Sequence, residues 1–223
     1  MRQTWHDLLF AHWPLPHAAL RPLVPAHLEL DQFSGECWVG VVPFRMSGVT
    51  GRAMPPLPGL SSFPELNVRT YVTHGEKPGV YFFSLDAASL PAVWAARKFF
   101  HLPYFHARMS CRNRGGDVLY SSQRLQSPAE FRANYRPTAA ARLREKGSLE
   151  NWLTERYCLY TTHHGQIYRS EIHHQHWPLH DAEAEFETNT VAAAAGISLP
   201  DTATSLLFAR RLEVLIWPLR RTD

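Results

Sequence analysis

Seventeen prolines are spread along the whole chain, and they limit what it can fold into. Proline lacks a backbone N–H and ends or kinks a helix, so a chain interrupted this often does not build long helices. The segments between the prolines are short, and many are rich in β-branched and aromatic residues, as strands are. We therefore predict an α+β protein that is mainly antiparallel β, forming a barrel or a sandwich, with three or four helices.

The length of the chain favours a single domain. Its 223 residues, 45% of them hydrophobic, are enough to bury a sizeable core. The sequence contains no internal repeat and no low-complexity linker. We therefore predict one domain over residues 1–223.

Composition also argues against several classes of partner. The net charge is +3, from 23 basic and 20 acidic residues, and no Lys/Arg-rich run is present, so we expect no nucleic-acid partner. No apolar run approaches the roughly 20 residues that span a bilayer, so we expect no membrane partner. The motifs GxGxxG, GxxxxGK[ST] and GxSxG are absent. Nucleotide binding of the usual kinds and a nucleophile elbow are therefore disfavoured.

The three cysteines suit a reducing compartment. Cys37, Cys111 and Cys158 are odd in number and far apart, and they form no CxxC pair. The first residues do not make a signal peptide, because the apolar stretch after them is short and broken by Pro14 and Pro16. We therefore predict a cytoplasmic protein.

Local patterns predict the elements. Turns are expected at Lys77-Pro78-Gly79 and Gly115-Gly116, and the Gly- and Pro-rich segment Gly48 to Pro64 is expected to be a long loop, which is often functional. Predicted helices cover residues 17–24, 91–100, 148–156 (with Ser148 as N-cap) and 190–195 (ending at Gly196). Predicted strands cover residues 37–46, 65–73, 80–85, 104–111, 117–123, 158–162, 166–173, 181–187 and 206–217.

The strand at 65–73 carries the most informative pattern. Because side chains alternate along a strand, Glu65, Asn67, Arg69 and Tyr71 share one face. In a sandwich this face would meet water, whereas in a closed barrel it would line the interior. There an arginine could hold a carboxylate by two parallel hydrogen bonds, and a glutamate with a shifted pKa could act as acid or base.

A second group of polar residues surrounds the end of the helix at 91–100. Arg97, Lys98, His101 and Tyr104 lie within ten residues, where the helix ends and the next strand begins. Such residues could serve a binding site, or they could be only caps and surface charges. The pattern alone leaves both readings open.

Histidines gather in the C-terminal half of the chain. His174 and His176 would share a face of a strand next to His173, and two imidazoles so placed could bind a metal with a carboxylate such as Glu183. The alternative is that these histidines are exposed or hydrogen-bonded. Trp177-Pro178 interrupts the strand, so we predict no metal ligand and no cofactor, and a histidine-bound metal enzyme is kept as an alternative.

Several stretches resemble the uncharacterised bacterial family DUF2071. They are Trp38-Val39-Gly40-Val41-Val42-Pro43-Phe44, Phe63-Pro64-Glu65-Leu66-Asn67-Val68-Arg69-Thr70-Tyr71, Phe82-Phe83-Ser84-Leu85-Asp86-Ala87, His101-Leu102-Pro103-Tyr104, and His173-His174 with Trp177-Pro178-Leu179. The resemblance runs from about Trp5 to Trp217 and so covers nearly the whole chain.

The DUF2071 family is similar in turn to acetoacetate decarboxylase. This resemblance implies a cone-shaped antiparallel β-barrel with a few helices outside it. It also implies a Schiff-base lysine, activated by a second lysine, in a Pro-Lys-Lys stretch that follows an arginine. In this chain Arg97 and Pro103 fall in register with that motif, but Tyr104 and Phe105 stand at the two lysine positions. Lys98 is a poor substitute, so we do not expect a Schiff-base decarboxylase.

Together these features predict a protein that binds a small anionic or carbonyl molecule inside the barrel. Glu65 would be an acid or base and Tyr104 a hydrogen-bond donor, while Asn67, Arg69, Arg97 and His101 would bind the substrate. If the protein is an enzyme, lyase or hydratase chemistry fits the Glu/Tyr pair. The rival hypothesis is a non-catalytic binding or interaction module. Apolar segments also leave a homo-oligomer open.

Overall fold

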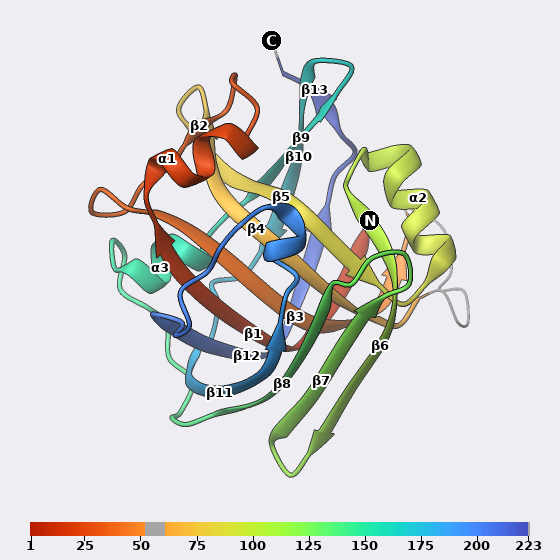
Figure 1. The fold of residues 1–223 in the computed structure, drawn as a ribbon, viewed down its shortest axis with the longest axis vertical. Coiled ribbons are helices and arrows are strands. Elements are labelled where there is room, and N and C mark those ends of the chain that lie inside the picture. Colours follow the sequence, from red (N-terminus) through yellow and green to blue (C-terminus); the bar gives the residue numbers. More distant parts are fainter. Residues whose placement is uncertain (52–60, 223) are drawn as a thin grey trace.

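The computed structural model describes residues 1–51 and 61–222 (Figure 1). Its helices are short: α1 (His17–Leu20), α2 (Leu90–Phe100) and α3 (Leu149–Thr154), with 3-10 turns at Arg21–Leu23 and Ala193–Ala195. The strands are β1 (Arg2–Leu15), β2 (Glu29–Leu30), β3 (Cys37–Thr50), β4 (Phe63–His74), β5 (Lys77–Ala87), β6 (Tyr104–Arg114), β7 (Asp117–Arg124), β8 (Glu130–Pro137), β9 (Cys158–His163), β10 (Gln166–His174), β11 (His180–Asn189), β12 (Ser205–Ile216) and β13 (Arg220–Arg221).

The sheet closes on itself to form a ring. Its strand order is β13-β10-β9-β5-β6-β7-β8-β11-β12-β1-β3-β4-β2, and two further pairings join β10 to β12 and β5 to β4. Strands β4, β3, β1, β12, β10, β9 and β5 therefore surround a common interior (Figure 1). The pairings are antiparallel except where β5 runs parallel to β6 and to β9. The prediction of a mainly antiparallel sheet with a few helices is confirmed.

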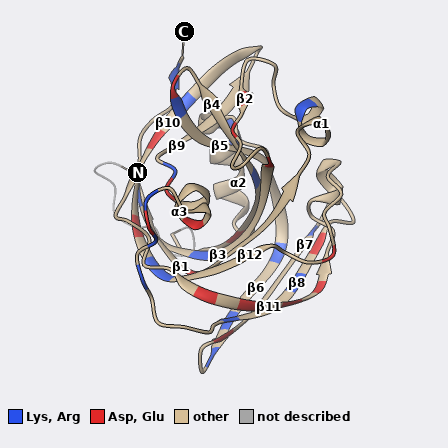
Figure 2. Ribbon diagram, turned by 90° about the vertical axis from the view of Figure 1, so that its left-hand side faces the viewer, with Lys and Arg blue, Asp and Glu red and all other residues tan. Residues whose placement is uncertain are grey.

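Two apolar cores lie on opposite sides of the central strands. Trp38, Val42 and Phe44 of β3 belong to the core inside the ring, which we call the ring core. Val39 and Val41 of β3 belong to a second core, shared with β7 and β8. Strand β3 is therefore buried on both faces, as its continuous apolar sequence predicts. The charged side chains of the outer strand β11 are all acidic, whereas the neighbouring β8 carries Arg132 and Arg136 besides Glu130 (Figure 2).

Several local predictions are confirmed by the backbone. The side chain of Ser148 caps α3 by accepting a hydrogen bond from the Asn151 amide. Helix α2 begins and ends within one residue of its predicted bounds. The predicted helix at 17–24 is divided into α1 and a 3-10 turn, because Pro22 interrupts it. At 190–195 only a 3-10 turn forms, and Gly196 ends it in the left-handed region.

The turn predicted at Lys77-Pro78-Gly79 is wrong, because these residues begin β5. The chain reverses two residues earlier, where Gly75 adopts a φ of 61°. Gly79 serves packing instead. A Cβ atom at this position would lie 2.7 Å from Sγ and 2.8 Å from the carbonyl oxygen of Cys158, so only glycine lets β9 approach β5 this closely.

Two of the long strands, β1 and β8, were not predicted from the sequence. The sequence of β1 does not indicate a strand, because Pro14 lies within it and Pro16 follows it. In the structure β1 nevertheless pairs with both β3 and β12. Strand β8 shows a clear alternation that could have revealed it: Phe131, Ala133 and Tyr135 are buried between exposed residues. The loop predicted from Gly48 to Pro64 lies largely outside the described residues, with β3 reaching Thr50 and β4 starting at Phe63.

Two surface features bear on partners. Within residues 1–51 and 61–222, no helix has the length and apolar character needed to cross a membrane. On α2, the large side chains of Leu90, Trp94 and Phe99 are exposed. The homo-oligomer stays a prediction, and this helix face is where it would be tested.

Candidate functional site

A small cavity lies inside the ring, beneath α2. Its volume is about 180 Å³, and members of the ring core such as Leu85, Leu159 and Ile216 line it. Helix α2 contributes small side chains, among them Ala95 and Ala96. The described lining is otherwise apolar or aromatic except for three polar side chains, Gln3, Glu65 and Tyr104. The cavity therefore suits a small molecule with an apolar body and one polar group.

Glu65 and Tyr104 are brought together in this cavity. The Tyr104 hydroxyl donates a hydrogen bond of 2.6 Å to Oε2 of Glu65. Glu65 comes from β4 and pairs with Ala87 of β5, while Tyr104 opens β6 and pairs with Leu85 of β5. Strand β5 therefore lies between the two residues, which pair with it at positions two residues apart.

The local electrostatics favour the protonated form of Glu65. Burial raises the pKa of Glu65 from 4.5 to about 8, although the hydrogen bond from Tyr104 acts in the opposite direction. Burial also raises the pKa of Tyr104 well above 10, and the adjacent Glu65 adds to this. At neutral pH the pair is therefore a carboxylic acid beside a neutral phenol, and it can donate to or accept from a bound carbonyl compound.

Arg97 and His101 lie outside the cavity. Arg97 is exposed on α2, and its Nε donates a 2.6 Å hydrogen bond to the Tyr104 carbonyl oxygen. His101 ends α2 in the left-handed region with a φ of 51°, and its ring stacks on His163 with centroids 3.7 Å apart. Both residues shape the turn that leads into Tyr104. Their roles in substrate binding stay predictions.

Asn67 and Arg69 face the ring interior but do not line the cavity. Asn67 is 4% exposed, and among the described residues its Oδ1 has no hydrogen-bond partner. Arg69 is 9% exposed, and its Nη2 donates a long hydrogen bond of 3.5 Å to the Leu153 carbonyl oxygen. The polar face of β4 thus points inward, one of the two arrangements that the sequence left open.

His12 is an interior residue that the sequence analysis missed, because β1 was not predicted. It is fully buried, and its Nε2 lies 2.6 Å from the Tyr71 hydroxyl. Gly40 lies between His12 and Arg69 in the sheet, pairing with both. A Cβ at Gly40 would lie 3.0 Å from the His12 ring and 3.5 Å from Cγ of Arg69. Burial, and secondarily the charge of Arg69, hold the pKa of His12 well below 6.5.

The candidate metal ligands are not assembled. His174 directs Nδ1 to the Gln175 carbonyl at 2.8 Å and Nε2 to the Arg156 carbonyl at 3.4 Å. His176 is exposed and pairs with Glu155, whereas Glu183 pairs with Arg136 on the outer layer. Within the part of the chain that the structure describes, no group of three His, Cys, Asp or Glu side chains is placed to hold a metal ion.

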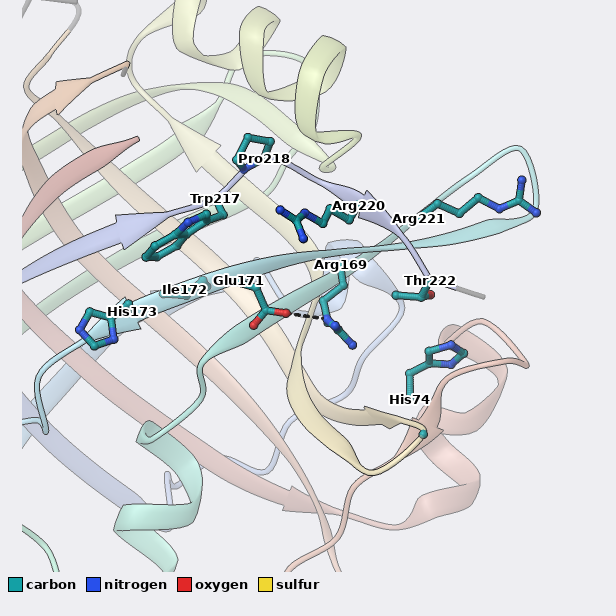
Figure 3. Close-up of a pocket in the computed structure, with 11 residues that line it drawn as sticks. His74, Arg169, Glu171, Ile172, His173, Trp217, Pro218, Arg220, Arg221 and Thr222 are labelled. Carbon is teal, nitrogen blue, oxygen red and sulfur yellow. Dashed lines mark hydrogen bonds and ion pairs between the residues drawn. The ribbon is translucent and has the colours of Figure 1, made fainter. Parts of the chain in front are cut away.

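A larger hollow lies on the outer surface near the C-terminus (Figure 3). Its volume is about 1030 Å³, and its lining includes Arg169, Glu171, Arg220 and Arg221. Arg169 is already paired with Glu171 at 2.8 Å, and the other two arginines are exposed. Size alone does not make this hollow the better candidate, because the inner cavity holds the buried acid with a shifted pKa.

Comparison with known proteins agrees with this architecture. The model of the DUF2071 family, described as an uncharacterized conserved protein, matches residues 2–213. The uncharacterized protein YqjF of Bacillus subtilis (strain 168) is 51% identical over 222 residues, covering 99% of this chain and 92% of the relative.

Solved structures show the same fold at low identity. Acetoacetate decarboxylase from Legionella pneumophila subsp. pneumophila str. Philadelphia 1 is similar with a TM-score of 0.66 and 12% identity, over 100% of this chain and 87% of that one. The enduracididine biosynthesis enzyme MppR, complexed with pyruvate, is similar with a TM-score of 0.68 and 9% identity, over 99% and 89%. The chain therefore belongs to the DUF2071 family and has the acetoacetate decarboxylase-like fold.

Proposed function

We propose that the chain binds a small carbonyl compound in the inner cavity, with Glu65 and Tyr104 at its polar end. The observation that carries this proposal is a buried carboxyl group, hydrogen-bonded to a tyrosine, in an otherwise apolar cavity. A neutral carboxylic acid in such surroundings donates a strong hydrogen bond to a carbonyl oxygen. Lyase or hydratase chemistry would use Glu65 as the group that gives or takes the proton.

The described lining contains no lysine, which argues against chemistry through an iminium. Lys98 is exposed on α2, and we infer from the resemblance to the decarboxylase motif that Tyr104 stands in place of its first lysine. A tyrosine cannot form a Schiff base, but its hydroxyl can orient the carboxyl group of Glu65. The related fold of MppR, solved with pyruvate, supports a small carbonyl compound as ligand.

A titration with the neutral ketone 2-pentanone tests the proposal. We expect chemical shift changes for residues that line the cavity, with affinity reduced by about tenfold in Glu65→Leu, which keeps bulk but removes the acid. Glu76→Leu is the matched control, because Glu76 is an exposed acid in the turn between β4 and β5. If the wild type and Glu65→Leu bound the ketone with equal affinity, Glu65 would not contact the carbonyl group of the ligand.

The same titration addresses the non-catalytic alternative. A binding module would hold the ketone without exchanging its α-protons, whereas an enzyme that uses Glu65 as a base would exchange them. Glu65→Gln keeps a hydrogen-bonding group but cannot take a proton, so it should bind the ketone without exchange. Loss of deuterium exchange from the ketone in Glu65→Gln, with binding retained, would indicate proton transfer by Glu65. No exchange in the wild type would favour the binding module.

A further inference from the structure

Among the described residues, Arg69 differs from the other buried arginines in having no acidic partner. Arg124 pairs with Asp86 at 2.6 Å, Arg156 with Asp31 at 2.5 Å, and the buried guanidinium of Arg144 with Asp181 at 2.6 Å. Among the described residues, Arg69 makes one long hydrogen bond, to a carbonyl oxygen, and its Nε has no partner. A buried cation without a counter-ion is costly, so Arg69 marks a place where an anion would be stabilised.

Other polar atoms in the ring interior also lack partners. Among the described residues, the Nε1 atoms of Trp38 and Trp177 make no hydrogen bond, and neither does Nδ1 of His12. When the Tyr71 hydroxyl donates to Nε2 of His12, Nδ1 carries the proton and is also a donor. Asn67 adds one unmatched acceptor. The excess of N–H donors over acceptors favours a ligand rich in acceptor oxygens.

These groups lie on adjacent positions of the interior face. Arg69 and Tyr71 share a face of β4, and Gly40 places Arg69 beside His12 across β3. The guanidinium carbon of Arg69 lies 5.4 Å from the ring centroid of Phe10. Phe10 in turn packs against Trp177, with the two ring centroids 4.9 Å apart. One side of the arginine is therefore walled by aromatic rings.

We propose that the ring interior at Arg69 binds a small organic monocarboxylate, with the guanidinium of Arg69 paired to the carboxylate and His12 and Tyr71 beside it. A single unpaired cation matches one negative charge. The planar guanidinium presents two parallel donors to a carboxylate, and the aromatic walls suit an apolar body better than a hydrated phosphate dianion. This site is separate from the cavity at Glu65, which Arg69 does not line.

Side-chain NMR with sodium propionate as the probe tests the proposal directly. We expect saturable shifts of the Arg69 Nε–H and His12 imidazole signals in the wild-type protein. In Arg69→Gln the affinity should fall by about tenfold or more, because a charge-assisted pair is lost. Arg69→Lys, which keeps the charge without the planar fork, should bind with intermediate affinity. Arg108→Gln, which removes an exposed arginine of β6, serves as the control and should bind like the wild type.

Three outcomes would overturn the proposal. They are the absence of a saturable shift at Arg69, equal shifts with sodium chloride at the same ionic strength, and tight binding of inorganic phosphate with none of propionate. If Arg69→Gln does not fold, the wild-type titration and Arg69→Lys still decide between these outcomes. Glu65→Gln should keep propionate binding at Arg69, so failure at this site and failure of the ketone site at Glu65 can be distinguished.

Discussion

The Tyr104 hydroxyl donates a 2.6 Å hydrogen bond to Glu65 across 39 residues of sequence, and both side chains line the inner cavity. The hydrogen bond links Tyr104, the first residue of β6, to Glu65 on β4, and the side chains around it are mostly apolar. Burial favours the protonated carboxyl group, whereas the tyrosine favours the carboxylate. The balance of these two effects leads to the first two predictions.

Tyr104→Phe should raise the pKa of Glu65 above its wild-type value of about 8. The substitution removes a donor that stabilises the carboxylate and leaves the burial in place. A carbon-13 NMR titration of the Glu65 carboxyl, identified by its absence in Glu65→Gln, measures the change. An unchanged or lower pKa would show that the hydrogen bond is not formed in solution.

Glu65→Gln should flatten the dependence of stability on pH. Because the folded-state pKa of Glu65 is raised, the wild-type protein loses stability as the pH rises from 4.5 through about 8, where the unfolded chain releases a proton that the folded chain retains. Urea unfolding on either side of this window measures the loss. The pKa of His12 is lowered, so His12 has the opposite effect: the protein loses stability as the pH falls below 6.5. This loss at low pH should remain in Glu65→Gln.

Arg69→Met and Arg124→Met should change the free energy of unfolding by amounts that differ in sign or size. Replacing Arg124 leaves Asp86 buried and unpaired and should cost about 3–5 kcal/mol of unfolding free energy. Replacing Arg69 removes a buried charge that has no acidic partner among the described residues, so we expect a change within about 1 kcal/mol or a gain in stability without ligand. Denaturant unfolding of both variants in anion-poor buffer is the measurement. Equal losses would mean that Arg69 has an acidic partner in solution.

Gly40→Ala should destabilise the protein by about 1–3 kcal/mol, because its Cβ would press on the His12 ring at 3.0 Å. The cost should be smaller in a His12→Ala background, where the opposing ring is absent. A double-mutant cycle measured by denaturant unfolding gives the coupling. Additive effects would show that the two residues are not in contact.

Ala96→Leu should fill the inner cavity and abolish 2-pentanone binding without unfolding the chain. Ala96 lines the cavity from α2, and the extra methyl groups would occupy a large part of its volume of about 180 Å³. Lys98→Leu is the matched control on the exposed face of the same helix. Retained ketone binding in Ala96→Leu would move the ligand site elsewhere.

Much of the local structure could be predicted from the sequence. The alternation of β4 determines that Glu65, Asn67, Arg69 and Tyr71 share one face, because successive side chains of a strand point to opposite sides. Ser148 and the alternation of β7 also carry their structural signals within a few residues. Strand β1 was missed because the prolines near its end hide a strand that pairs with two long-range partners.

Only the tertiary structure decided which way the polar face of β4 points and which residues join it. The β4–β5 and β10–β12 pairings close the ring and turn this face inward. The left-handed residue His101 brings Tyr104 to Glu65, while Arg97 remains outside. Alternation is a local property of the backbone, whereas ring closure depends on contacts between segments far apart in the chain. For that reason the sequence by itself determined the shared face of β4, and the fold determined that this face points into the ring.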